Sequence, residues 1–153
     1  MSVRSAIAVA AVLGGLAVGG AWTATRPASA RAAQGMKWTA TLTSQGGGTV
    51  KGTASLAPGT GAGSSVATIS ITGGKAGSAY PWHIHTGKCG GAGGVFGSGA
   101  AYKPVTAGAD GSGTSTANLS AGAPTTGDFH VNVHASASDM HTLVACGDLT
   151  MAM

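Results

Sequence analysis

Charged residues are scarce in this chain of 153 residues, and acidic residues are the scarcest. Only 8% of the residues are Asp, Glu, Lys or Arg, and glutamate is absent. The formal net charge of +4 comes from eight Lys and Arg against four Asp, without any basic run. Because nucleic-acid binding depends on clustered Lys and Arg that contact phosphates, nucleic acid is not an expected partner.

The sequence also lacks any segment in which apolar residues recur with helical spacing over ten positions. Thr, Val, Ser and Gly predominate instead, with 28 glycines, and these residues favour strands and turns. Short segments of alternating character recur at intervals of about 8–14 residues, which is typical of all-β domains. We therefore expect an all-β fold, an antiparallel Greek-key β-sandwich or barrel with seven or eight strands.

Period-two alternation predicts where the individual strands lie. Residues 36–44 place Trp38, Ala40 and Leu42 on one face, and residues 49–57 return after a glycine turn, which predicts a β-hairpin. Further strands are expected at 66–72, 79–86, 128–136 and 142–152, with a second hairpin between 103–109 and 114–120 around the D-G-S-G turn. The glycine-rich stretch from 87 to 101 predicts a long loop.

The N-terminal 30 residues have the features of a secretory signal peptide. A lone Arg4 precedes an uncharged run, and Ala28-Ser29-Ala30 supplies an A-x-A cleavage site. An uncleaved N-terminal membrane anchor is the alternative, because about 20 apolar residues can span a bilayer. In both cases we expect a loose tail at 31–35 and one domain at 36–153 outside the cytoplasm, with no membrane contact once the signal is cleaved.

The chain contains two cysteines, Cys89 and Cys146. An even number of cysteines in an exported chain predicts a disulfide bond. That bond would close a loop of about 57 residues and contribute about 4 kcal/mol in the loop-entropy model. Two unpaired thiols or a cysteine metal ligand are the alternatives.

Two of the five histidines share one face of a predicted strand. In YPWHIHTGKC (80–89), His83 and His85 stand two residues apart, which in a strand separates their Cα atoms by about 6.6 Å. Two imidazoles at that spacing can bind one metal ion. Since no carboxylate lies nearby in sequence, they favour copper, zinc or nickel over hard cations. A pair of exposed or internally hydrogen-bonded histidines is the alternative.

The other three histidines lie in FHVNVHASASDMH (129–141). His130 and His134 also share a face, but four strand residues separate them by about 13 Å, so only one of them can complete the first pair. We favour His134, because it lies where the strand runs into a loop. His141 is a further candidate ligand, since the disulfide would bring its segment toward the loop that follows the first pair.

These motifs, in this order, resemble the Cu/Zn superoxide dismutase family. An H-x-H strand is followed by a cysteine loop, then by V-N-V-H-A-S-A-S-D, and A-C-G-D-L stands near the C-terminus; the match covers roughly 79–149. The resemblance implies an eight-stranded Greek-key barrel and a disulfide between the two cysteines. It also implies copper ligands at His83, His85 and His134, completed by His141, Met140 or water.

The chain departs from that family's pattern at two places. Residues 86–129 contain no histidine, whereas in the family this region carries the imidazole that bridges copper and zinc, together with other zinc ligands. A zinc site is therefore not expected. Leu143 stands three residues before Cys146, where the family has an arginine that guides superoxide. Lys88 and Lys103, near the histidine loop, are the candidates for weak attraction of that anion.

A second resemblance keeps other functions open. H-I-H-x-G followed by V-N-V-H is similar to the chordin-type (CHRD) domain, an extracellular β module, although that family lacks the paired cysteines and the A-C-G ending. We first expect a secreted superoxide dismutase-like copper protein, with copper ion as partner and superoxide as the substrate that the resemblance implies. An extracellular copper-binding or copper-carrying protein and a structural CHRD-like module are the alternatives.

Overall fold

The computed structural model describes residues 36–152, and within them the chain is built almost entirely from strands. These are β1 (Lys37–Ser44), β2 (Lys51–Pro58), β3 (Ser65–Thr72), β4 (Ala79–Tyr80), β5 (Trp82–Thr86), β6 (Val105–Thr106), β7 (Gly113–Leu119), β8 (Phe129–Ser136) and β9 (Asp139–Ala152). A single short 3-10 helix, η1, spans Gly99–Ala101. Over the same range, no helix is long and apolar enough to cross a membrane. The predicted signal peptide and tail lie outside the described residues.

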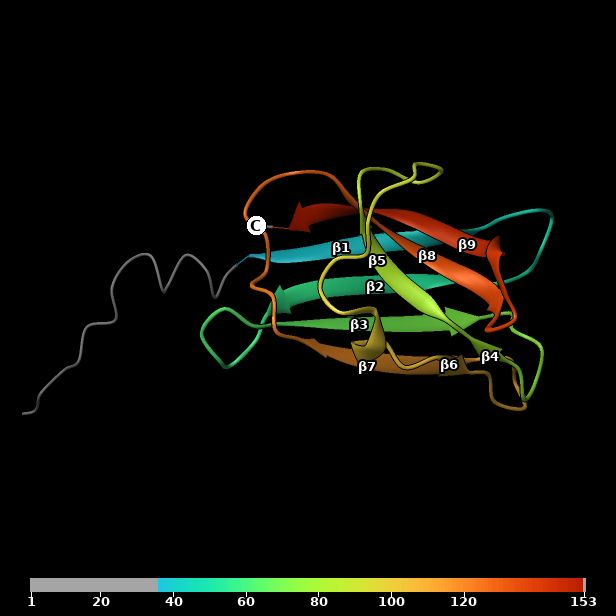
Figure 1. The fold of residues 1–153 in the computed structure, drawn as a ribbon. Helices are drawn as coiled ribbons and strands as arrows, with labels where there is room; N and C mark the ends of the chain where they lie inside the picture. Colours follow the sequence, from blue (N-terminus) through green and yellow to red (C-terminus); the bar gives the residue numbers. More distant parts are fainter. Residues whose placement is uncertain (1–35, 153) are drawn as a thin grey trace, which may run out of the picture.

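Seven of the strands form one antiparallel sheet in the order β5-β8-β9-β1-β2-β3-β7, and β4 pairs with β6 separately. Figure 1 shows this sheet curled into a half-barrel. β1, β2 and β3 follow one another as a meander, whereas the connections from β3 to β5 and from β7 to β8 join opposite ends of the strand order. Such long returns are Greek-key connections. The predicted all-β, antiparallel Greek-key fold is therefore confirmed.

Alternation along the strands places the apolar side chains in one core. Trp38, Ala40 and Leu42 of β1 are at most 5% exposed, as the period-two pattern predicts. β1 and β2 pair in an antiparallel register from Trp38↔Leu56 to Leu42↔Gly52, which confirms the first predicted hairpin. Buried side chains of β5 and β8 belong to the same cluster as those of β1–β3 and β7, so the curled sheet encloses a single core.

The second predicted hairpin is wrong. The turn itself forms, since Gly108 N–H donates to Ser112 O at 2.7 Å, but β6 pairs with β4 and β7 pairs with β3. The β3–β7 ladder runs over seven residue pairs and buries Ala117 and Leu119, so tertiary pairing outweighs the local turn. The predicted strand at 79–86 is interrupted at Pro81, which has no N–H for a ladder.

β8 is buried on both faces, and this burial creates the setting of the histidines. Phe129, Val131 and Val133 enter the core, while the outward-facing His130, Asn132 and His134 are also buried. The loop at 87–101 contacts that outer face through Gly87 O, which lies 3.0 Å from His130 Nδ1. The loop runs beside β5, where Phe96 N–H donates to Ile84 O and Thr86 N–H donates to Gly94 O.

Candidate metal centre

Three histidines converge on the outer face of the sheet. His83 and His85 project from β5 and His134 projects from β8, and their candidate ligand nitrogens lie within 4.8 Å of one another. The ring centroids are 5.9 Å apart for His83–His85, 5.7 Å for His83–His134 and 6.5 Å for His85–His134. The structure thus brings together the three histidines that the sequence singled out first.

The pairing of β5 with β8 accounts for the position of His134. The two strands are antiparallel, with Trp82 opposite Val133 and His85 opposite His130. The pairing continues beyond the first residue of β5, because His134 N–H donates to Pro81 O at 2.8 Å. His134 therefore reaches the cluster from the side of His83, while His85 reaches it from the opposite side.

The ring of His85 has a defined tautomer. Its Nδ1 lies 2.9 Å from Gly93 O, and because a carbonyl oxygen can only accept, Nδ1 carries the hydrogen. Its Nε2 is buried and has no hydrogen-bond partner among the described residues, so it presents a lone pair. A Cβ at Gly93 would overlap the Thr86 carbonyl oxygen, so glycine permits the loop to approach this closely.

His134 is the most buried of the three converging histidines, at 6% exposed. In the described part of the chain neither of its ring nitrogens has a hydrogen-bond partner. Leaving a buried polar group unpaired costs about 1–3 kcal/mol, so this residue needs a further partner. A metal ion between the three rings would supply one.

Two histidines of the cluster, His83 and His134, have lowered pKa values that favour the neutral, metal-binding form of the ring. Burial, together with the neighbouring His134 and His85 rings, lowers the pKa of His83 to about 4, and burial makes the largest contribution. Burial also lowers the pKa of His134. Since metal ions bind the deprotonated imidazole, these ligands need not release a proton at neutral pH.

The donor set fits a transition-metal ion. Bonds of about 2.0–2.1 Å place two nitrogens at most about 4.2 Å apart, so a group within 4.8 Å needs only small side-chain rotations. Three imidazoles without a carboxylate suit copper, zinc or nickel rather than magnesium or calcium. The cluster could therefore hold one metal ion.

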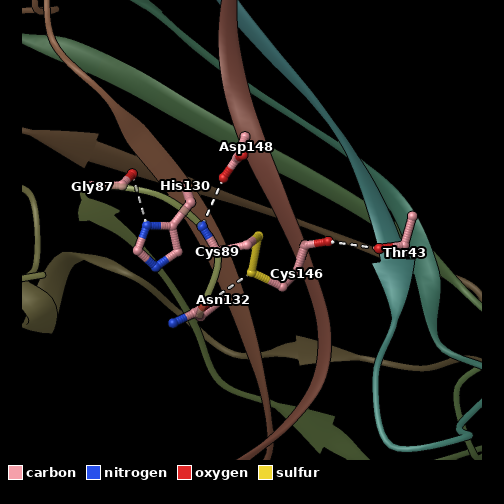
Figure 2. Close-up of a disulfide and its surroundings, with 7 residues drawn as sticks. All are labelled: Thr43, Gly87, Cys89, His130, Asn132, Cys146 and Asp148. Atoms are coloured by element: carbon pink, nitrogen blue, oxygen red, sulfur yellow. Dashed lines mark hydrogen bonds between the residues drawn. A yellow bond between two sulfur atoms is a disulfide. The ribbon is translucent and has the colours of Figure 1, made fainter. Parts of the chain in front are cut away.

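The remaining two histidines lie outside this group. His130 is fully buried, donates from Nδ1 to Gly87 O at 3.0 Å (Figure 2), and stacks on His85 with centroids 5.4 Å apart at 20°. Its Nε2 has no partner among the described residues, but it is not one of the converging nitrogens. His141 is exposed on β9 and does not join the group either.

The disulfide between Cys89 and Cys146 is present and ties the loop to β9. Figure 2 shows how the loop is held there: Cys89 N–H donates to Asp148 Oδ1 at 2.7 Å. Asn132 Oδ1 lies 3.1 Å from Cys146 Sγ, and because a disulfide sulfur has no hydrogen, this is a polar contact rather than a hydrogen bond. A disulfide is consistent with an extracellular location.

Several features around the cluster were not identified from the sequence. The carbonyls of Gly87 and Gly93 orient two histidine rings, and Tyr102 packs on His83 with centroids 5.3 Å apart. No sequence pattern marks a carbonyl in an irregular loop. Lys88 does not act as an unpaired charge, because its Nζ lies 3.0 Å from Asp128 Oδ1.

A hollow of about 550 Å³ lies elsewhere, over the outer faces of β1, β2 and β3. Its lining consists mainly of threonine and serine side chains, and none of the three converging histidines belongs to it. The candidate metal site is therefore the histidine cluster and not this hollow.

No protein-family model matches the chain, and no curated protein matches it.

Proposed function

We propose that this protein binds one copper ion through His83, His85 and His134 and works outside the cytoplasm as a superoxide dismutase-like copper protein. One observation carries the proposal: three imidazoles from two strands converge, and nitrogens of two of them are buried without a partner. Such nitrogens are costly unless a ligand satisfies them.

Copper is favoured over the other metals that suit imidazole. Divalent copper binds a given nitrogen site more tightly than its first-row neighbours, and these three ligands offer no carboxylate that would favour a harder ion. The absence of histidine from 86–129 argues against a second, zinc-binding site of the kind found in the family that the motifs resemble. The disulfide and the N-terminal signal-like sequence support export.

Copper, when bound, would supply the one-electron chemistry that converts superoxide to O₂ and peroxide. His83, His85 and His134 would hold the ion, and because His83 and His85 are only partly buried, a small ligand can approach from solvent. Attraction of an anion is weak. Leu143 occupies the position of the family's arginine, and Lys88 is paired with Asp128. We therefore expect dismutation slower than that of a site with a guiding cation.

The same electrostatic observation favours one alternative, a copper-binding or copper-carrying protein without catalytic turnover. A structural CHRD-like module is the remaining possibility, and it predicts no retained metal. The three proposals differ in two measurable quantities, copper retention and superoxide turnover.

The test combines both measurements on one sample. The purified, oxidised protein is loaded with Cu(II), dialysed, and assayed for metal content and for superoxide dismutation. We expect one copper, no zinc, and loss of both copper and activity in His134→Ala. The matched control is His141→Ala, an exposed histidine outside the group. Retained copper without turnover would support the carrier, and no retained copper would refute the proposal.

A further inference from the structure

Tyr102 lies across the edge of the strand that carries two of the proposed ligands. Its ring packs against Trp82, with centroids 4.9 Å apart at 89°, and against His83, with centroids 5.3 Å apart at 69°. Consecutive strand residues point to opposite faces of a sheet. A ring that contacts both must therefore pass around the edge of β5, which is the terminal strand of the sheet.

Two hydrogen bonds hold Tyr102 in that position. Its hydroxyl donates to Phe96 O at 2.8 Å, and the side chain is 6% exposed. On the core side, Trp82 Nε1–H donates to Lys103 O at 2.8 Å, which fixes the backbone directly after Tyr102. The tyrosine ring is thus fixed at its tip and at its base.

The ligands of the cluster are oriented by different means. A hydrogen bond from Nδ1 to Gly93 O fixes the ring of His85. The ring of His83 lies between the Tyr102 ring, which packs against it, and the Gly99 backbone, where a Cβ would lie 3.7 Å from Nε2. A ligand ring without a fixed rotamer loses affinity, because the ion must then order it.

We propose that Tyr102 is the positioning residue for His83, and that its ring, fixed across the edge of β5, holds the His83 imidazole at the angle from which it meets His85 and His134. This inference rests on the proposed copper site. Tyr102 acts through His83 and is not a ligand.

The chain offers a matched control in its other tyrosine. Tyr80 is also 6% exposed, and its hydroxyl is also hydrogen-bonded, accepting from Lys75 N–H at 2.8 Å. It has no aromatic contact with the described histidines. Tyr80→Leu therefore reports the general effect of losing a buried tyrosine, whereas Tyr102→Leu adds any effect on His83.

The experiment measures copper affinity by competition with a chelator and the Cu(II) hyperfine coupling by electron paramagnetic resonance, for the wild type, Tyr102→Leu, Tyr102→Phe and Tyr80→Leu. We expect Tyr102→Leu to lower affinity about tenfold, as other supporting residues do, and to change the hyperfine coupling. Tyr102→Phe keeps the ring and should restore both values nearly to those of the wild type. Tyr80→Leu should leave the spectrum unchanged.

A metal-free measurement separates this inference from the proposed function. In the apo protein with labelled histidines, the ring current of Tyr102 should displace the His83 ring resonances in the NMR spectrum. That displacement should vanish in Tyr102→Leu and remain in Tyr102→Phe. If the wild type binds no copper, the proposed function fails, while the NMR result still shows whether Tyr102 orients His83.

Two results would overturn the inference. One is a folded Tyr102→Leu protein with wild-type affinity, hyperfine coupling and His83 resonances. The other is failure of both Tyr102→Leu and the longer, more flexible Tyr102→Met to fold, which would assign the residue to the stability of the barrel.

Discussion

At the scale of single residues, the site depends on keeping histidines neutral and correctly oriented. His85 is restricted to one tautomer by Gly93 O, so its Nε2 is available to an ion. Burial lowers the pKa values of His83 and His134, which prevents protonation from competing with metal at neutral pH. This arrangement destabilises the metal-free protein, because buried polar nitrogens then remain without partners.

The lowered pKa of His83 predicts how the stability of the metal-free protein depends on pH. An unfolded histidine has a pKa near 6.5, whereas that of folded His83 is about 4. Between these values the unfolded chain binds a proton that the folded chain does not, so stability decreases as pH falls through this window and levels off below pH 4. After discounting for partial exposure, we expect a loss on the order of 1–2 kcal/mol from this residue.

Chemical denaturation between pH 7 and pH 4, with a chelator present, measures this dependence. His83→Asn should reduce the slope of the free energy of unfolding against pH, although His134 still contributes. His141→Asn, which changes an exposed histidine outside the cluster, is the matched control for the loss of one histidine. An unchanged slope in His83→Asn would show that this residue does not stay neutral in the folded protein.

At the scale of elements, the histidine site depends on both the strands and the loop at 87–101. The strands place the histidines on one face, but the loop supplies the carbonyls that orient His85 and His130. It can do so because it pairs briefly with β5 at His85↔Val95 and is fastened at Cys89. A largely irregular loop thus fixes side chains of two strands.

This division explains how much the sequence predicted. Alternation identified the β fold and the first hairpin, and the H-x-H spacing identified two histidines on one face, because these depend on local strand geometry. The choice of His134 over His130 came from its place where the strand runs into a loop. The pairing of β7 with β3, and the roles of Gly93 and Tyr102, depend on contacts between distant segments. No local pattern encodes them, and the D-G-S-G turn even favoured the wrong pairing.

A substitution at Gly93 tests whether the close approach of the loop to β5 orients His85. A Cβ there would overlap Thr86 O, so Gly93→Ala must push the loop away from β5 and weaken the bond to His85 Nδ1. We expect a loss of about 1–3 kcal/mol in the free energy of unfolding, as for other overpacked sites. Copper affinity should fall about tenfold or more, because a residue that supports a ligand is displaced.

The adjacent glycine is the control for this substitution. A Cβ at Gly94 would have no atom within 4 Å and its backbone is not in the left-handed region, so Gly94→Ala should leave both stability and copper affinity close to wild type. Thermal unfolding and a chelator competition measure the two quantities. Equal behaviour of the two variants would refute the role assigned to the close approach of Gly93.

At the scale of the whole molecule, two cross-connections hold the half-barrel together around its core. Lys103 O accepts hydrogen bonds from Trp82 Nε1 of β5 and from Ser115 Oγ of β7, and thereby links the two ends of the strand order. The disulfide links the loop to β9, the long strand that pairs with both β8 and β1. Both links adjoin the elements that carry the histidines, so barrel stability and site geometry are coupled.

The disulfide therefore predicts a joint effect of reduction on stability and on the metal centre. The bond joins cysteines 57 residues apart. Its loss should cost about 4 kcal/mol by the loop-entropy relation and lower the melting temperature by about 10 °C or more. Because the released loop carries the Gly93 carbonyl that orients His85, copper affinity should fall as well.

The measurement compares thermal unfolding and copper affinity of the oxidised protein, the reduced protein and the double variant Cys89→Ala/Cys146→Ala. Reductant should shift the wild type to the values of the double variant and leave the double variant unchanged. A lower melting temperature with unaltered copper affinity would show that the strands alone define the site, and that the loop only covers it. Loss of both together would show that the fold and the metal centre depend on the same covalent link.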